Sequence, residues 1–69
     1  MKIVFTKHAE QQIKERKIER IWVEETLKAP DKIYKEDEKY YAHKKLNDHT
    51  IEVVYEKQTY IKVITTYWL

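Results

Sequence analysis

Three histidines are the side chains of this sequence best suited to move a proton near neutral pH. His8 stands four residues before Gln12, which stands four before Arg16, so on a helix the three share one side. Such a ridge could transfer a proton at His8 and hold a phosphate at Arg16, close to a helix N-terminus that attracts anions. Alternatively, His8 bonds a backbone carbonyl and the other two side chains only line a helix rim.

A second group of candidates lies in the segment KYYAHKKL, residues 39–46. Tyr41, His43 and Lys45 alternate there, so in a strand they would share one face. That face could stack a base on the tyrosine and bind a phosphate through the lysine, with the histidine as acid or base. The alternative is a solvated strand face without a function.

The sequence gives little support for a metal site. It has no cysteine, and no two histidines have the HxH or HxxxH spacing that is typical of metal ligands. His49 follows the Asn47-Asp48 pair and is expected to be a turn residue. We therefore expect neither a metal nor another cofactor. Because there are no cysteines for disulfides and no apolar run long enough to span a membrane, we expect a cytoplasmic protein.

Composition indicates one small domain. The 69 residues should form a single domain with a small core, since a chain of this length buries only about 60 % of its unfolded surface. Glycine is absent and 38 % of the residues are charged, a trend found in heat-adapted proteins. The net charge of +2 permits RNA binding without requiring it, because most surface lysines are only solvated.

Helical periodicity governs the first half of the chain. Thr6 can cap a helix over residues 7–16, and a wider apolar row predicts a second helix over 19–29. The two are joined by a tight turn at Lys17. Pro30 ends the second helix, because the residue before a proline avoids the helical region.

After Pro30 the period changes to two. β-branched and aromatic residues alternate with polar ones, which predicts strands at 31–35, 39–46, 50–57 and 60–69. The second and third are joined by a hairpin turn at Asn47-Asp48. With a short strand or extended lead-in at 2–5, the order is β-α-α-β-β-β-β. We predict an α+β domain with two helices on one face of an antiparallel sheet of three to four strands.

Alternation also assigns the two faces of the sheet. The face toward the helices should hold Ile51, Val53, Tyr55, Ile61, Val63, Thr65 and Tyr67, and the opposite face Glu52, Val54, Glu56, Lys62, Ile64, Thr66 and Trp68. No further element remains to cover that opposite face, so it is expected to bind a partner. The predicted partner contacts are Trp68, Ile64 and Val54. Trp68 should dominate, because large aromatic residues dominate interface energies.

The segments HAEQQIKERKI, VEETLKAPDKIY and EVVYE with YIKVITTY together resemble the family called domain of unknown function 4258. That family is similar to the RelE/ParE toxins of bacteria. The shared features map to His8-Ala9, Arg16, Pro30, and Thr65 or Thr66 with Tyr67. Two positions depart from the pattern, since Gln12 replaces a common arginine and Lys17 a glycine. The first change removes a phosphate contact, and the second costs on the order of 1 kcal/mol if the backbone is left-handed.

The resemblance implies a toxin–antitoxin function. RelE/ParE toxins are mostly ribosome-dependent mRNA endonucleases or gyrase inhibitors, each neutralised by an antitoxin. We therefore hypothesise a metal-independent endoribonuclease that acts on mRNA and is paired with an antitoxin; a homodimer is a further option. Its catalytic residues would be His8, Arg16, His43 and Tyr67, and its RNA contacts Arg20, Lys45 and Gln12. The alternatives are a non-catalytic module that binds protein or nucleic acid through the open face, and a catalytically inactive toxin relative.

Overall fold

A computed structural model describes residues 2–69 of the chain. Two helices and five strands follow one another as β1 (Ile3–Phe5), α1 (Lys7–Glu15), α2 (Arg20–Lys28), β2 (Lys32–Glu36), β3 (Lys39–Leu46), β4 (His49–Lys57) and β5 (Ile61–Trp68). The predicted α+β fold and its element order are confirmed. Within residues 2–69, neither helix is long and apolar enough to cross a membrane.

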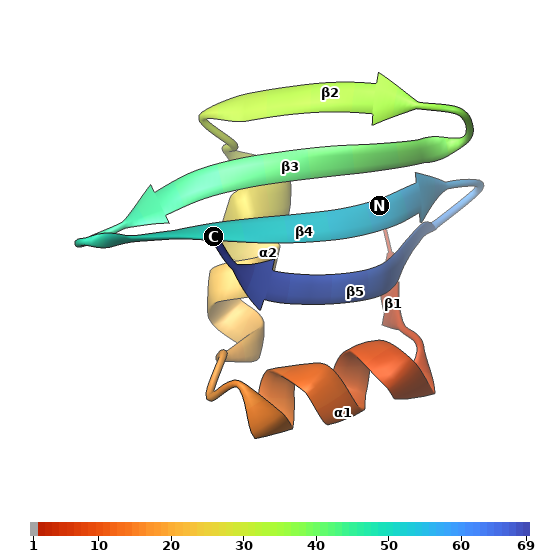
Figure 1. Ribbon diagram of the computed structural model, residues 1–69. Helices are drawn as coiled ribbons and strands as arrows, with labels where there is room; N and C mark the ends of the chain where they lie inside the picture. The colour runs from red at the N-terminus through yellow and green to blue at the C-terminus, as the bar shows by residue number, and fades with distance from the viewer. Residues whose placement is uncertain (1) are drawn as a thin grey trace.

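The sheet has five strands, in the order β1-β5-β4-β3-β2, rather than the predicted three to four (Figure 1). Strands β2 to β5 form an antiparallel meander, as predicted. The lead-in at the start of the chain is a real strand, and it pairs parallel with β5, with Ile3 opposite Ile61. The sheet is therefore mixed, with its one parallel pair at an edge.

The turn between the helices explains how a chain without glycine reverses sharply. Thr6 caps α1, since its Oγ1 accepts a hydrogen bond from the Ala9 N–H at 3.0 Å. At the other end, the Ile18 N–H donates to the Ile13 carbonyl at 2.8 Å, the long bond of a Schellman motif. That motif places Lys17 in the left-handed region with φ 55°, within the tight turn that the sequence predicted.

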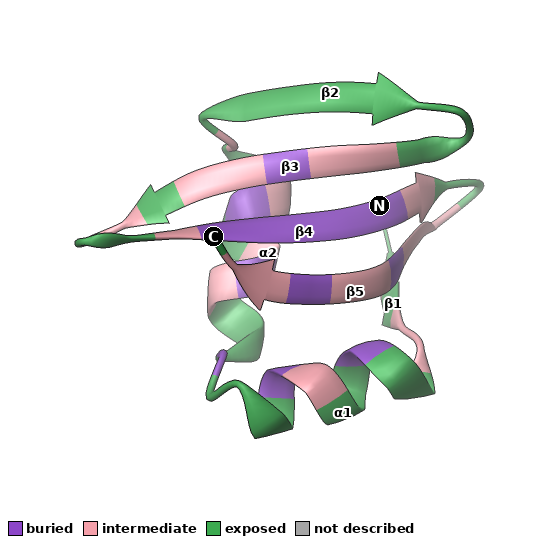
Figure 2. Cartoon of the chain, in the orientation of Figure 1, coloured by how far each residue is buried: buried purple, intermediate pink, exposed green. Residues whose placement is uncertain are grey.

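The core lies between the sheet and the helices. α2 crosses behind the middle of the sheet, while α1 lies along β5 at the opposite edge from β2 (Figure 1). Central strand β4 is the most buried and β2 is exposed throughout (Figure 2). The buried apolar cluster consists of Ala9, Ile13, Ile18, Val23, Ala42, Ile51, Val53, Tyr55 and Val63. The expected inward face of β4 is therefore confirmed.

A β-bulge in β5 overturns part of the face assignment. Tyr55 pairs with Val63 but Val54 pairs with Thr65, so Ile64 is an extra residue between them. Everything after the bulge is shifted to the other face. Thr66 and Trp68 face the helices, and Thr65 and Tyr67 face the open side, so the predicted faces of these four residues were wrong.

The tryptophan expected on the open face lies on the helix side instead. The Trp68 ring lies 5.8 Å from that of Trp22 on α2, and its Nε1–H donates to the Arg16 carbonyl at 3.1 Å. Val54 does lie on the open face, but it is only 4 % exposed. Neither residue therefore offers the fully exposed apolar anchor that the sequence suggested.

Candidate functional site

The open face of the sheet carries a compact group of polar and aromatic side chains. Because paired residues in neighbouring strands share a face, the register identifies its members. They are Lys32 and Tyr34 on β2, Tyr41, His43 and Lys45 on β3, Glu52 and Val54 on β4, and Thr65 and Tyr67 on β5. Neither helix of residues 2–69 lies over this face, which is turned toward the viewer in Figure 1.

Glu52 is the centre of the group and is only 3 % exposed. His43 on β3 and Tyr67 on β5 lie directly opposite it on either side. Its Oε2 contacts His43 Nε2 at 2.5 Å and accepts from the Tyr34 hydroxyl at 3.2 Å, while its Oε1 accepts from the Tyr67 hydroxyl. We call these four residues the Glu52 cluster. A buried carboxylate with three donors has its hydrogen-bonding needs met.

The cluster fixes the charge of its carboxylate and of its two tyrosines. Burial alone would raise the pKa of Glu52, but hydrogen bonds from Tyr67, His43 and Tyr34 outweigh it and lower the pKa below its usual value. The hydrogen bond to Glu52, with burial, raises the pKa of Tyr67 to about 12. Burial and the nearby carboxylate likewise raise the pKa of Tyr34. At neutral pH, an ionised Glu52 therefore accepts hydrogen bonds from two protonated tyrosines.

This charge state also fixes the histidine tautomer. An ionised carboxylate can only accept, so Nε2 of His43 carries the hydrogen and Nδ1 is left as the basic nitrogen of the neutral ring. The Tyr34 ring meets the imidazole edge-on at 5.4 Å and stacks on Tyr41 at 5.1 Å. The side chain of His43 keeps 18 % of its surface exposed. It is thus oriented by a carboxylate and still reachable from solvent, as a general base must be.

Two lysines border the partly exposed His43. Lys32 pairs with His43 across β2 and β3, and Lys45 is the next residue on the same face of β3. Both are exposed, and neither ammonium forms an ion pair within residues 2–69. A phosphate above His43 would therefore meet two cations.

A comparison with family models places the chain. The model of a domain of unknown function (DUF4258) matches residues 5–68. The chain belongs to the DUF4258 family. Searches of curated proteins and of solved structures found no match. Among residues 2–69, no three histidine or acidic side chains come together as a metal site would require.

In this DUF4258 domain, Gln12 and Arg16 on the side of α1 cover one edge of strand β5. Strand β1 pairs only with the first three residues of β5, so within residues 2–69 the edge of β5 that faces away from β4 has no strand beside its second half. Gln12 Oε1 accepts from the Thr66 N–H at 3.4 Å and from the Thr65 hydroxyl, and Arg16 donates to the Thr66 carbonyl at 3.0 Å. The two side chains replace a sheet neighbour and block strand addition. An arginine at position 12 could not accept a hydrogen bond from the Thr66 N–H. This contact gives a structural explanation for a glutamine at that position.

The other N-terminal candidates lie apart from the Glu52 cluster. His8 is exposed near the start of α1. The start of α1 lies at the end of the sheet far from where β5 ends (Figure 1). Arg20 forms an ion pair with Glu10 and lies 4.4 Å from the centre of the Phe5 ring. The structure therefore brings together His43, Tyr67 and Lys45 of the predicted site residues. Arg16 reaches the backbone of Thr66 beside Tyr67, but within residues 2–69 no hydrogen bond or ion pair joins the side chains of His8, Arg16 or Arg20 to those three.

Sequence reasoning missed Glu52 and Tyr34 as site residues. Glu52 was read as one polar position in an alternating strand. A usable signal was present, because Glu52 interrupts the apolar run IEVVY and the neighbouring strand carries a histidine. Tyr34 gave no such signal, since it is one of six tyrosines in the chain.

Proposed function

We propose that this DUF4258 domain is a metal-independent endoribonuclease of the RelE/ParE kind, which acts on mRNA in the cytoplasm. The observation that carries the proposal is the pairing of a partly exposed His43 with the buried Glu52, on an uncovered sheet face bordered by Lys32 and Lys45. A histidine oriented by a carboxylate is a common general base. Cations beside it suit a phosphodiester substrate.

The proposed reaction uses the ribose as nucleophile. Nδ1 of His43 takes the proton from the 2′-hydroxyl, the 2′-oxygen attacks phosphorus, and the bond from phosphorus to the 5′-oxygen breaks. The departing 5′-oxygen takes a proton from the Lys45 ammonium, and the product is a 2′,3′-cyclic phosphate. Lys32 stabilises the added negative charge on the phosphate. Tyr67 acts as a positioning residue, because its raised pKa and its bond to Glu52 keep it protonated.

The tyrosines suit an RNA substrate in single-stranded form. The stacked pair of Tyr34 and Tyr41 presents aromatic surface beside the histidine, and Tyr34 is 43 % exposed. Stacking of a base on such a side chain is worth about 1–3 kcal/mol and tolerates any sequence. In this proposal the tyrosines hold a base while the lysines hold the adjacent phosphate.

An antitoxin is part of the same proposal. A segment lying across the open face would cover His43 and Tyr67 and so inhibit cleavage. Strand β2 is exposed along its whole length, so such a segment could also pair with its edge. Lys32 and Lys35 on that strand would attract an acidic partner.

The proposal is tested by incubating the purified chain with end-labelled RNA in the presence of a chelator. We expect cleavage that continues without divalent metal and yields 2′,3′-cyclic phosphate ends. The matched control is the same oligonucleotide with 2′-deoxyribose at the cleaved position, which should stay intact. Cleavage of the deoxy control, or complete dependence on metal, would contradict this mechanism.

The saturated hydrogen bonding of Glu52 favours one alternative, a non-catalytic module that binds single-stranded RNA. In that case the Glu52 cluster only holds the tyrosines in place as a stacking surface. Binding without any cleavage would support it. Tyr34→Ala should then weaken RNA binding by roughly ten-fold or more, as expected for loss of one stacking partner.

A further inference from the structure

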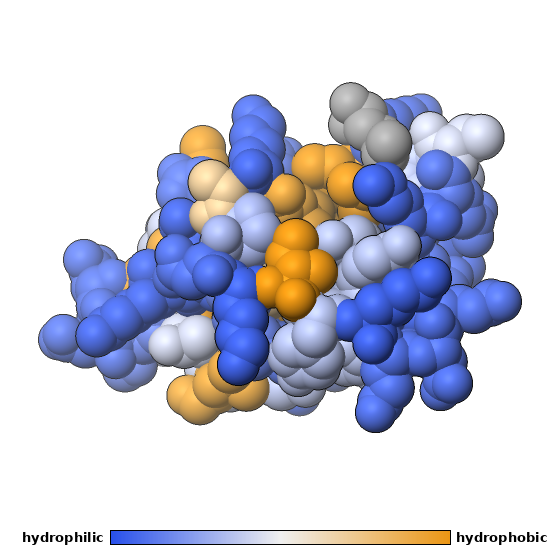
Figure 3. Space-filling model, turned by 90° about the horizontal axis from the view of Figure 1, so that it is seen from above, coloured by the Kyte–Doolittle hydropathy of each residue, from blue (hydrophilic) through white to orange (hydrophobic). Residues whose placement is uncertain are grey.

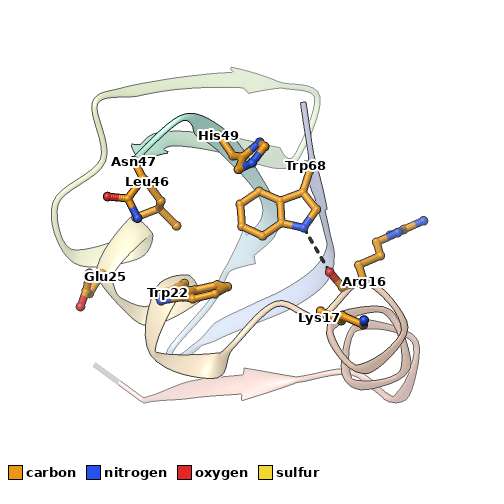
Figure 4. A pocket seen from close by; sticks show the side chains of 8 residues that line it. All are labelled: Arg16, Lys17, Trp22, Glu25, Leu46, Asn47, His49 and Trp68. Carbon is orange, nitrogen blue, oxygen red and sulfur yellow. Dashed lines mark hydrogen bonds between the residues drawn. The ribbon is translucent and has the colours of Figure 1, made fainter.

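A second candidate site lies at the end of the sheet where β3 turns into β4 and β5 ends. It is a cavity of about 540 Å³, within the range of small-molecule pockets. Its walls come from the α1–α2 turn, α2, the β3–β4 turn and the end of β5 (Figure 4). We call it the tryptophan pocket, because Trp22 and Trp68 both line it. No residue of the Glu52 cluster belongs to it.

The two tryptophans form a fixed aromatic wall. Their ring centres are 5.8 Å apart and the planes are tilted by 59°, so one ring does not cover the other. The Arg16 carbonyl holds the Trp68 indole N–H, and the His49 ring packs against it at 5.8 Å. Both indoles are only half-buried. A flat ring entering the pocket would therefore find an aromatic surface that is already positioned.

The cationic residues of the pocket lie at one end, and the acidic and amide residues lie at the other. In Figure 4, Arg16 and Lys17 lie on one side of the tryptophans, and Glu25 and Asn47 lie on the other. The side chains of Lys17, Glu25 and Asn47 form no hydrogen bond within residues 2–69. The pocket thus has the Lys17 ammonium at one end, beside the Arg16 guanidinium that also donates to the Thr66 carbonyl, a flat aromatic middle, and a carboxylate with an amide at the far end.

We propose that the tryptophan pocket binds a nucleotide whose base carries an exocyclic amino group, as adenine does. The base would stack on the indoles, its amino group would donate to Glu25, and its phosphate would lie near Lys17 and Arg16. A flat cation would be repelled at the Lys17 end, and an apolar ring would gain no hydrogen bond from the exposed Glu25. The nucleotide can be free or part of an RNA strand. The inference does not depend on cleavage at the open face.

Tryptophan fluorescence gives a direct test. The chain has two tryptophans and both line the pocket, so emission excited where tyrosine does not absorb reports on this site. The probes are adenosine monophosphate and inosine monophosphate. The adenosine compound has an amino group on its base where the inosine compound has a carbonyl. We expect saturable quenching, with the adenosine compound binding at least about five-fold more tightly, as one hydrogen bond to a carboxylate would give.

Two variants locate the contacts. Glu25→Ala should abolish the preference for adenosine, while Glu24→Ala, the neighbouring control, should retain it. Lys17→Gly should weaken both nucleotides alike. Quenching that does not saturate, or equal binding of the two nucleotides by the wild type, would overturn the proposal.

A final arm identifies the source of the base and separates this inference from the proposed cleavage. A short oligoadenylate that binds more tightly than the mononucleotide, with an affinity that falls steeply with salt, indicates an RNA strand. Equal affinities indicate a free nucleotide. His43→Ala should leave both titrations unchanged, so loss of cleavage and loss of pocket binding are distinguishable.

Discussion

Removing the Tyr67 hydroxyl should destabilise the domain more than removing any other tyrosine hydroxyl on the open face. Tyr67 is the one donor to Glu52 Oε1 within residues 2–69, so Tyr67→Phe leaves that buried oxygen unpaired. A hydrogen bond to a charged group contributes about 1.5–3 kcal/mol. Tyr34→Phe should cost only about 0.5–1.5 kcal/mol, because Oε2 keeps its bond to His43. For a domain of this size, 1 kcal/mol corresponds to a shift of roughly 4–8 °C in Tm.

The assay is denaturant unfolding followed by circular dichroism, with Tyr41→Phe as the control. The Tyr41 hydroxyl forms no hydrogen bond within residues 2–69, so its loss should leave the free energy of unfolding nearly unchanged. A cycle that combines Tyr67→Phe with Glu52→Gln isolates the pair, and the two changes should be clearly non-additive. Equal effects of the three Tyr→Phe changes, or an additive cycle, would refute the view that Glu52 organises this face.

Four further predictions follow from particular contacts. Thr66→Val should stabilise the fold by about 1 kcal/mol in thermal unfolding, because the buried Thr66 hydroxyl has no hydrogen-bond partner within residues 2–69; a loss of stability would contradict this. Lys17→Gly should stabilise the fold by up to about 1 kcal/mol and so raise Tm, because glycine relieves the left-handed backbone at φ 55°, whereas Lys17→Ala should not. Gln12→Leu should destabilise by about 1–3 kcal/mol, since the Thr66 N–H loses its acceptor, and Gln11→Leu on the exposed side is the control. Stability against pH should fall at both extremes: the contribution of Glu52, whose pKa is lowered, is present above its unfolded pKa and lost as the pH falls through the folded value. That of Tyr67, whose pKa is raised from 10.0 to about 12, is present below pH 10.0 and lost as the pH rises toward about 12, and Tyr67→Phe should lack this alkaline loss.

Local patterns were enough to predict most elements of the fold. Thr6 and Pro30 are chemical signals for the start and end of the helical half, and the predicted strand at 39–46 coincides with β3. The hairpin at Asn47-Asp48 is also present, with Asn47 at φ 59°. Each of these features depends on residues close together in the sequence.

The bulge at Ile64 could not be predicted by the same means. Val63 and Ile64 are both apolar, and the next two residues are both threonine, so either phase of alternation fits the segment. The pairing with β4 decides between them. This one-residue shift moved Trp68 to the helix side and created the tryptophan pocket.

The candidate site was predicted only in part, for a similar reason. His43 was recognised by its chemistry, because the chain has only three histidines, whereas Tyr67 was suggested by the family resemblance. The role of Glu52 depends on partners in three other strands, which no local pattern reveals. Gln12 and Arg16 were correctly placed on one side of a helix, but what they bind is the edge of a strand about fifty residues further along the chain.

The most direct test of the proposed function compares RNA cleavage rates of His43→Ala and His8→Ala with that of the wild type, in a chelator and at equal folded concentrations. General-base catalysis contributes about 10²–10⁴-fold to a rate. We expect His43→Ala to lose activity by that factor, and His8→Ala, which alters an exposed histidine outside the Glu52 cluster, to retain it. Full activity of folded His43→Ala, or loss of activity in His8→Ala alone, would contradict the assignment of catalysis to the open face.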